Sequence, residues 1–242
     1  MIDLHSHILP GIDDGAKDLQ SALDMAQQAL GVGVDKMVCT PHIHMGYFDN
    51  NIQIIKTVYQ TLLMALKKTE CELKIAFAAE VRICPEIIQW VKTNDIPYIG
   101  QWQGRKAMLL ELPHSHIPPG SDKLIRWLMS NHIQPIIVHP ERNRDIIANF
   151  KRIYPLKRAG AIFQVTAGSI TGRFSPSIRD IAFKMLDEEL ISFVASDTHN
   201  TDRRPNDMGL CRDVLLDRVG EPLSSQLLFD TPKKITEHLQ WS

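Results

Sequence analysis

The residues of this chain best suited to chemistry are histidines and carboxylates that recur in short motifs. Eight of the ten histidines lie in or just beyond these motifs, and only His132 and His238 fall elsewhere. In chain order the candidates are His5 and His7, His42 and His44, Glu80, Glu111 with His114 and His116, His139, and Asp197 with His199. Mixed imidazole and carboxylate ligands suit Mn, Fe, Zn or Co. The residue types therefore predict a metal site.

The spacing within the motifs supports one shared site. Residues two apart in a β-strand project from the same face, so His5 with His7 and Asp197 with His199 can each present two ligands to one cavity. A single histidine at a strand end is more often a structural residue. Several strands that end in this way favour a metal site, because buried imidazoles and charges without partners are costly.

The elements that must position these residues alternate along the chain. Apolar runs predict strands at 2–7, 36–42, 74–83, 106–112, 134–139, 161–166 and 191–197. Helical spacing lies at 19–30, 52–68, 86–93, 121–131, 144–157, 176–188 and 207–219. A strand followed by a helix, repeated in this way, predicts parallel β/α units. We expect an α/β fold built as a closed or nearly closed β/α barrel, with an open doubly wound sheet as the alternative.

Both architectures place catalytic groups at the C-terminal ends of their strands. The candidate histidines and carboxylates fall at these ends of the predicted strands. No linker, low-complexity tract or short repeat marks a boundary, so we expect residues 1–242 to form one domain.

Composition narrows the classes of partner. With 27 Lys and Arg against 28 Asp and Glu, the net charge of −1 gives no global field that would attract nucleic acid or an anionic membrane. The start of the chain lacks the features of a signal peptide, and no run approaches the length of a membrane span, so we expect a cytoplasmic protein without membrane insertion. The four cysteines show no C-x-x-C spacing and are expected to be reduced.

Several other chemistries are excluded by missing motifs. Cysteine-dependent tyrosine phosphatases need C-x5-R, but the sixth residue after each cysteine is Met45, Phe77, Trp90 or Asp217. The chain also lacks a Walker A loop, a G-x-S-x-G elbow, an H-E-x-x-H pair and a G-x-G-x-x-G turn.

Six segments form an ordered set of motifs. They are Ile-Asp-Leu-His-Ser-His-Ile-Leu-Pro-Gly-Ile-Asp-Asp-Gly-Ala at 2–16, Thr-Pro-His at 40–42, Ala-Ala-Glu at 78–80, Leu-Glu-Leu-Pro at 110–113, His-Pro-Glu-Arg at 139–142 and Ala-Ser-Asp-Thr-His at 195–199. Together these segments resemble the polymerase and histidinol phosphatase (PHP) family. More narrowly, they resemble its bacterial protein-tyrosine phosphatase branch, the manganese-dependent enzymes of capsule and exopolysaccharide loci. The resemblance covers the whole chain.

The resemblance implies one PHP phosphatase domain, 1–242, folded as a distorted, TIM-like (β/α)7 barrel. It also implies three divalent metal ions at the C-terminal mouth, with Mn expected and Fe, Zn or Co as alternatives. The ligands carried over from the motifs are His5, His7, Asp14, His42, Glu80, Glu111, His139, Asp197 and His199. Glu80 is the expected bridging carboxylate. Asp14, rather than its neighbour Asp13, is chosen on the family pattern alone.

The implied reaction is hydrolysis of phosphotyrosine. Clustered metal ions can lower the pKa of a bridging water, whose hydroxide attacks phosphorus while the ions hold the phosphoryl oxygens. Arg142 and Arg204 are the expected cationic partners of the phosphoryl group, because guanidinium groups suit phosphate oxygens. Arg203 is the alternative to Arg204, and both predicted arginines could instead form structural salt bridges.

The resemblance also implies a partner, the tyrosine-rich tail of a bacterial tyrosine autokinase that controls polysaccharide export. Two alternatives stay open: a small-molecule phosphatase of the histidinol-phosphatase type, and a non-catalytic binder of a phosphotyrosine tail. An exonuclease is disfavoured because basic patches are missing. The predicted helices 19–30 and 52–68 could carry a homo-oligomer surface, although packing against the barrel explains their apolar positions equally well.

The sequence leaves several residues near the site undecided. His44, Tyr47 and Phe48 share one loop and could contact substrate or pack the rim. His114 and His116 lie in a proline-rich loop that could simply shape the rim.

Overall fold

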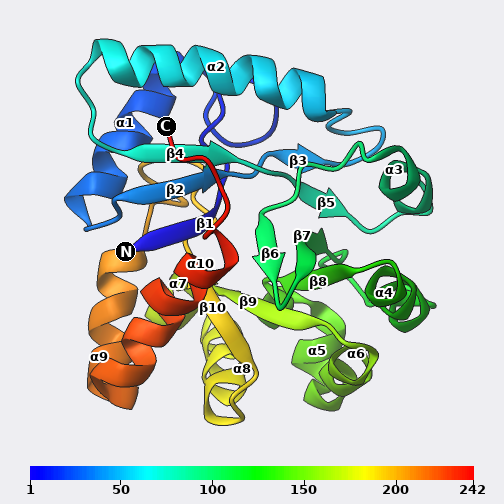
Figure 1. The fold of residues 1–242 in the computed structure, drawn as a ribbon. Helices are drawn as coiled ribbons and strands as arrows, with labels where there is room; N and C mark the ends of the chain where they lie inside the picture. Colours follow the sequence, from blue (N-terminus) through cyan, green and yellow to red (C-terminus); the bar gives the residue numbers. More distant parts are fainter.

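Strands form the centre of the molecule, and helices lie outside them (Figure 1). The structure is a computed structural model that describes residues 1–242. The strands are β1 (Ile2–Ser6), β2 (Lys36–Cys39), β3 (His42–Ile43), β4 (Lys74–Phe77), β5 (Glu80–Arg82), β6 (Gly100–Trp102), β7 (Arg105–Glu111), β8 (Ile133–Val138), β9 (Ile162–Thr166) and β10 (Ile191–Ala195). The α-helices are α1 (Leu19–Gly31), α2 (Ile52–Lys68), α3 (Ile87–Thr93), α4 (Ser121–Ser130), α5 (Arg144–Ala148), α6 (Ile153–Ala159), α7 (Ala167–Thr171), α8 (Pro176–Asp187), α9 (Met208–Ser225) and α10 (Thr231–Ile235). Short helical segments of other types are η1 (Pro140–Arg142), η2 (Phe150–Arg152) and η3 (Gln226–Asp230).

The strands belong to two sheets that join into a ring. One sheet has the order β1-β2-β4, and the other runs β10-β9-β8-β7-β5-β3, with β6 antiparallel beside β7. The Asp197 N–H donates to the His5 carbonyl at 2.8 Å, and the His7 N–H donates to the Thr198 carbonyl at 2.9 Å, which joins β1 to the end of β10. On the other side, β2 and β4 lead directly into β3 and β5. The α/β class with parallel β/α units is confirmed, and the ring closure is that of a distorted barrel rather than an open sheet.

Two of the predicted strands are each divided in two. The predicted strand 36–42 is interrupted at Thr40 and Pro41, where the proline has no N–H for the ladder. The predicted strand 74–83 is interrupted at Ala78 and Ala79. After these breaks both strands pair within the second sheet, where His42 and Glu80 are direct register partners.

Other predicted elements differ more locally. The predicted helix 144–157 is divided into α5, η2 and α6, because Asn149 has extended backbone angles and its side chain accepts from the Lys151 N–H. The predicted helix 207–219 continues to Ser225 through a kink at Gly220, whose φ is 77°. The sequence patterns missed β6 and the short helix α7.

Successive side chains of a strand point to opposite faces, and this divides the core into two layers. Leu109 belongs to an inner cluster of 12 buried residues inside the ring, whereas its neighbours Met108 and Leu110 belong to an outer cluster of 51 residues beneath the helices. Ile235 of α10 joins the inner cluster, and α10 lies across one end of the ring in Figure 1. The opposite end, where the strands finish, is therefore the end available for a site.

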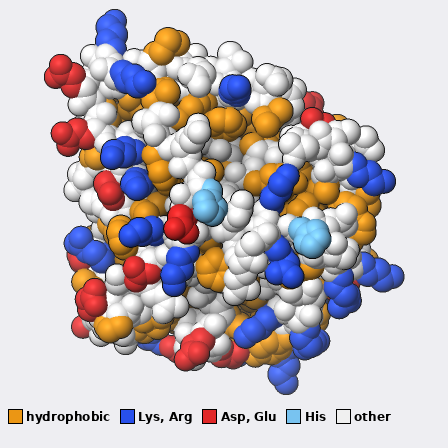
Figure 2. All heavy atoms as spheres, in the orientation of Figure 1, with side chains coloured by type: hydrophobic (Ala, Val, Ile, Leu, Met, Phe, Trp, Pro, Cys, Tyr) orange, Lys and Arg blue, Asp and Glu red, His pale blue; other side chains and the backbone are white.

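On the face that carries α10 and β6, Lys and Arg side chains predominate over the right and lower right, and most of the Asp and Glu side chains lie on the left and at the bottom (Figure 2). None of the helices combines the length and the apolar composition needed to cross a membrane.

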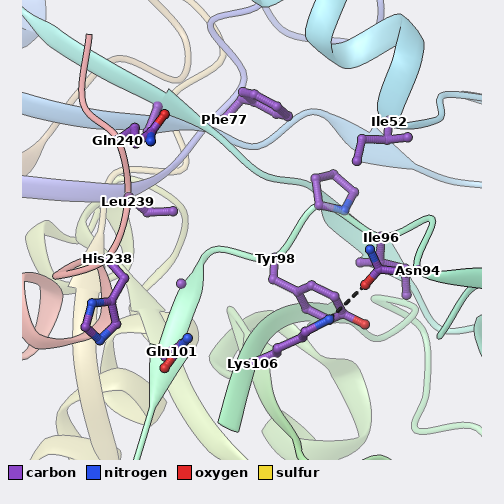
Figure 3. A pocket seen from close by; sticks show the side chains of 13 residues that line it. Ile52, Phe77, Asn94, Ile96, Tyr98, Gln101, Lys106, His238, Leu239 and Gln240 are labelled. Atoms are coloured by element: carbon purple, nitrogen blue, oxygen red, sulfur yellow. Dashed lines mark hydrogen bonds between the residues drawn. The ribbon is translucent and has the colours of Figure 1, made fainter. Parts of the chain in front are cut away.

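A cavity of about 470 Å³ lies between β4, β6 and residues 238–240 (Figure 3). Inside it, the Lys106 ammonium donates to the Asn94 side chain at 2.8 Å and lies 4.9 Å from the centre of the Tyr98 ring. None of the candidate histidines and carboxylates of the sequence motifs lines this cavity.

The inner layer of the core can be tested with a matched pair of leucines. Leu109 is fully buried, and Leu109→Ala should lower the free energy of unfolding by about 2–5 kcal/mol, because it removes packed methyl groups and leaves a cavity. Leu210 on α9 is 59% exposed, and Leu210→Ala should change the free energy of unfolding by no more than about 0.5 kcal/mol. Urea denaturation measures both, and equal effects would contradict the assignment of the inner layer.

Candidate metal centre

The candidate residues converge where the strands of the ring finish. His5 lies within β1, one residue before its end, and His7 directly follows β1. Asp14 precedes α1, His42 begins β3, Glu80 begins β5, Glu111 ends β7, His139 follows β8, and Asp197 and His199 follow β10. The structure brings all nine predicted side chains together, through overlapping groups and ion-pair contacts. Their role as metal ligands stays a prediction.

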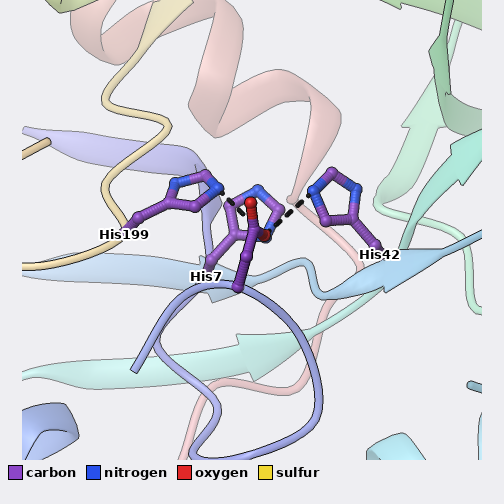
Figure 4. Close-up of side chains that lie close together, drawn as sticks. His7, His42 and His199 are labelled. Atoms are coloured by element: carbon purple, nitrogen blue, oxygen red, sulfur yellow. Dashed lines mark ion pairs between the residues drawn. The ribbon is translucent and has the colours of Figure 1, made fainter. Parts of the chain in front are cut away.

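The outermost group surrounds Asp14. The Asp14 Oδ1 atom lies 3.3 Å from His42 Nε2 and 3.4 Å from His199 Nε2. The ring of His7 completes the group, in which the ligand atoms all lie within 4.8 Å of one another (Figure 4). The Asp14 side chain is 50% exposed, whereas His7 is fully buried, so this group lies at the mouth of the ring.

Glu80 lies at the centre of the arrangement and is fully buried. Its Oε2 atom lies 3.3 Å from Nε2 of both His5 and His7, and 2.9 Å from His42 Nδ1. Its Oε1 atom lies 2.8 Å from His139 Nε2. One carboxylate thus contacts four candidate histidines, which is the geometry expected of a bridging ligand.

Asp197 faces histidines with one oxygen and arginines with the other. Its Oδ1 atom lies 3.3 Å from His7 Nε2, and its Oδ2 atom accepts hydrogen bonds from Arg142 and, at 2.8 Å, from Arg204. The two arginines predicted to bind phosphate are therefore beside the candidate centre and paired with Asp197. Arg203 is exposed and does not share this contact, so Arg204 is the residue of the two that reaches the centre.

A third group joins Glu111 and His139 to His114, again with ligand atoms within 4.8 Å. Arg82 forms an ion pair with the Glu111 Oε1 atom at 2.9 Å. The sequence analysis missed Arg82, although its position two residues after Glu80 on β5 is the spacing that places both on one face.

The side chains fit bound divalent ions. Four buried atoms of this cluster have no hydrogen-bond partner, namely His42 Nδ1, Glu80 Oε2, Asp197 Oδ1 and His199 Nε2. His42 Nδ1 and Glu80 Oε2 are 2.9 Å apart but lack the geometry of a hydrogen bond. Buried polar atoms are normally satisfied, so this convergence of nitrogen and oxygen atoms fits cations bound among them.

Two buried side chains contact His7 and His5 on the side of each ring that faces away from the cluster. The Asp13 Oδ2 atom lies 2.8 Å from His7 Nδ1, and the Gln164 Oε1 atom lies 3.0 Å from His5 Nδ1. In both cases the opposite nitrogen, Nε2, faces the cluster, the arrangement that fixes ring orientation in metal sites. Asp13, which the sequence left undecided, is therefore placed behind His7. Gln164 was missed, and its only signal was one amide within an apolar strand.

Burial and neighbouring charges set the ionisation of the cluster. Burial would raise the pKa of Glu80, but His42 and His5 hold it well below its usual value. Burial and the nearby Arg142 charge lower the pKa of His139 to about 3, and burial and His7 lower the pKa of His199 to about 4. Neutral imidazoles and ionised carboxylates are the forms that bind metals. Burial opposes the charge on His42, but the Glu80 carboxylate raises the pKa of His42 to about 10 in the metal-free protein.

The backbone is constrained where it presents these ligands. His139 and Asp197 have φ values of 36° and 53°, a left-handed conformation that ordinary residues adopt only at a cost and that is concentrated at functional sites. At Gly15, an added Cβ would lie 2.0 Å from the His7 carbonyl oxygen. Only glycine allows the loop that carries Asp13 and Asp14 to fold back onto His7.

The undecided rim residues have distinct environments. Tyr47 is 78% exposed and stacks on His44, with ring centres 4.6 Å apart. Phe48 stacks on His42 at 5.5 Å, so it supports a candidate ligand. His116 interacts with the Ser115 hydroxyl at 2.8 Å and belongs to none of the ligand groups.

The close approach at Gly15 gives a test of the site. Gly15→Ala should weaken divalent metal binding by about tenfold or more, because the loop holding Asp13 and Asp14 must move away from His7. Gly31→Ala is the matched control, since its added Cβ would meet no atom within 4 Å. Calorimetric titration with Mn²⁺ measures both, and equal affinities in the two variants would contradict the proposed role of the loop.

Comparison with known proteins places the chain among bacterial tyrosine phosphatases. It is 34% identical to the tyrosine-protein phosphatase YwqE of Bacillus subtilis (strain 168) over 204 residues. The aligned region covers 84% of this chain and 79% of YwqE. It is 28% identical to the tyrosine-protein phosphatase CpsB of Streptococcus pneumoniae over 240 residues. The aligned region covers 97% of this chain and 98% of CpsB.

The fold has solved counterparts. A chain from the crystal structures of YwqE and CpsB, described as unique metal-dependent tyrosine phosphatases, matches with a TM-score of 0.91 and 31% identity over 99% of this chain and 96% of that one. An organophosphorus hydrolase from Deinococcus radiodurans, 15% identical, shares only the fold, with a TM-score of 0.53 over 96% of this chain and 90% of its own. The model of the family described as "Capsular polysaccharide synthesis, CpsB/CapC" matches residues 1–237. The chain therefore belongs to the CpsB/CapC family of capsular polysaccharide synthesis.

Proposed function

We propose that this protein is a metal-dependent protein-tyrosine phosphatase, formed by a single domain that spans residues 1–242. The observation that carries the proposal is the convergence of the nine predicted ligands, with Glu80 at their centre, and four of the nine have a buried atom without a hydrogen-bond partner. Membership of the CpsB/CapC family, whose relatives YwqE and CpsB are named tyrosine-protein phosphatases, supports the substrate class.

The side chains divide among three metal positions in this proposal. Asp14, His42 and His199 would hold the outer ion, and Glu111 with His139 a second. His5, His7 and Asp197 would hold the third, with Glu80 as the carboxylate shared between positions. When bound, the ions supply a water of lowered pKa and a positive field for the phosphoryl oxygens. Manganese is the proposed metal, by family resemblance, and the same ligands suit Fe, Zn or Co.

The chain's own residues have three roles in hydrolysis. Asp13 and Gln164 hold the rings of His7 and His5 in place through their outer nitrogens. Arg142 and Arg204, anchored on Asp197, lie where their remaining N–H groups can bind phosphoryl oxygens as the charge on them changes. Burial of Glu80 and Asp197 excludes water from the inner side of the centre, which strengthens these electrostatic contacts.

The physiological substrate in this proposal is the phosphotyrosine tail of a bacterial tyrosine autokinase that regulates capsular or exopolysaccharide synthesis. The family name, which refers to capsular polysaccharide synthesis, supports this choice. A cytoplasmic location is part of the same proposal, and the four free cysteines agree with a reducing compartment.

Substrate and metal dependence can be tested together. Protein reconstituted with Mn²⁺ should release phosphate from a phosphotyrosine peptide, and chelation followed by dialysis should abolish this release. Histidinol phosphate, assayed beside the peptide, should be a poor substrate. Preferred turnover of histidinol phosphate would overturn the substrate assignment, whereas metal and peptide binding without turnover of either ester would indicate a non-catalytic binder.

The arginines give a second test. Arg142→Ala should lower kcat/KM for the peptide by about 10²–10³-fold, because a charged donor to the phosphoryl group is lost. It should also weaken inhibition by inorganic phosphate. Arg144→Ala is the control, since Arg144 is exposed and makes no ion pair with the cluster. Unchanged kcat/KM in Arg142→Ala, with metal content as in the wild type, would exclude a phosphate contact.

A further inference from the structure

His114 lies outside the nine predicted ligands, yet the structure brings it to the same centre. Its ligand-capable nitrogen lies within 4.8 Å of ligand atoms of both Glu111 and His139. The rings of His114 and His139 are 5.6 Å apart between centres and are inclined at 66°. Each of the two imidazoles therefore has a nitrogen within 4.8 Å of a Glu111 carboxylate oxygen.

The loop that carries His114 is fastened to the segment that carries His139. The Arg144 N–H donates to the His114 carbonyl at 2.8 Å, so the backbone of His114 itself is fixed. The Asn143 side chain donates to the carbonyls of Pro113 and His116 at 2.7 and 3.0 Å. These bonds join the loop after β7 to residues just beyond η1, so the two histidines are positioned by one local structure.

We propose that His114 is a further protein ligand of the metal position formed by Glu111 and His139. This proposal rests on the metal centre of the proposed function and adds an imidazole to it. Glu80 already contacts His139 at 2.8 Å, so the position would have two carboxylates and two imidazoles. Such a nitrogen and oxygen set suits Mn, Fe, Zn or Co.

The exposure of His114 determines what this ligand would do. Glu80, Glu111 and His139 are buried, whereas His114 is exposed and approaches from the solvent side. A position with three protein ligands keeps a place open for water or substrate, and an imidazole bound as the fourth ligand occupies that place. His114 is therefore the ligand of this position that a phosphoryl oxygen could replace from solvent.

His116 provides a matched control within the same loop. It is also exposed, lies two residues further along, and contacts Ser115 rather than any candidate ligand. Both substitutions, His114→Ala and His116→Ala, remove an exposed imidazole from the same segment. Differences between them report the position of the ring and not general damage to the loop.

The test is a Co²⁺ titration of the full chain, followed by calorimetry and by visible absorption, which responds to the number and type of ligands. His114→Ala should weaken one class of Co²⁺ site by at least about tenfold and change its absorption bands, since a nitrogen ligand is lost. His116→Ala should match the wild type in both measurements. Circular dichroism of the metal-free variants checks that the fold is retained.

Each outcome decides the proposal. Wild-type affinity and absorption in His114→Ala would overturn the role of His114 and leave the proposed metal centre intact. Equal changes in His114→Ala and His116→Ala would overturn it as well, because the effect would then belong to the loop. Failure of the wild-type protein to bind Co²⁺ would overturn both this proposal and the metal centre.

Discussion

The Glu80 carboxylate is fully buried and lies within 3.3 Å of nitrogens of four histidines. A buried charge of this kind is tolerated only where opposite charges or metal ions surround it. The strand ends bring four histidines to Glu80, and the loop over His7 fixes one of them through Asp13. Two arginines balance the charge of the neighbouring Asp197. Several of the surrounding buried atoms have no hydrogen-bond partner, which fits the proposal that ions bind among them.

The barrel meets this requirement through small departures from regular geometry. Breaks after β2 and β4 move His42 and Glu80 into register with each other in the second sheet. Left-handed backbone conformations at His139 and Asp197 turn these side chains at the ends of their strands. The breaks after β2 and β4 could not be seen in the hydrophobic pattern of the sequence, in which both strands look continuous. The hydrophobic pattern reports burial, and both halves of each divided strand are largely buried.

Sequence patterns predicted the parts of the molecule that depend on periodicity and spacing. The parallel α/β architecture followed from alternating apolar runs, and α2 has the predicted bounds. The convergence of the candidate side chains followed from paired histidines at strand ends, which bring their side chains to one place in any parallel barrel. Contacts of individual side chains between strands and between loops were not predictable in this way. Gln164 and Arg82 act on His5 and Glu111 from other strands, and His114 meets His139 only because two loops are hydrogen-bonded together. The division of the helix predicted at 144–157 had a local signal in Asn149, a residue that caps helices.

The central claim is that the nine converging side chains hold divalent ions. Crystals grown with Mn²⁺ and measured at the manganese absorption edge test this claim most directly. The account predicts anomalous peaks among the ligand atoms around Glu80, with one ion beside Asp14, one beside Asp197 and one beside Glu111. A map without anomalous density at these residues, from protein that is folded and saturated with Mn²⁺, would contradict it.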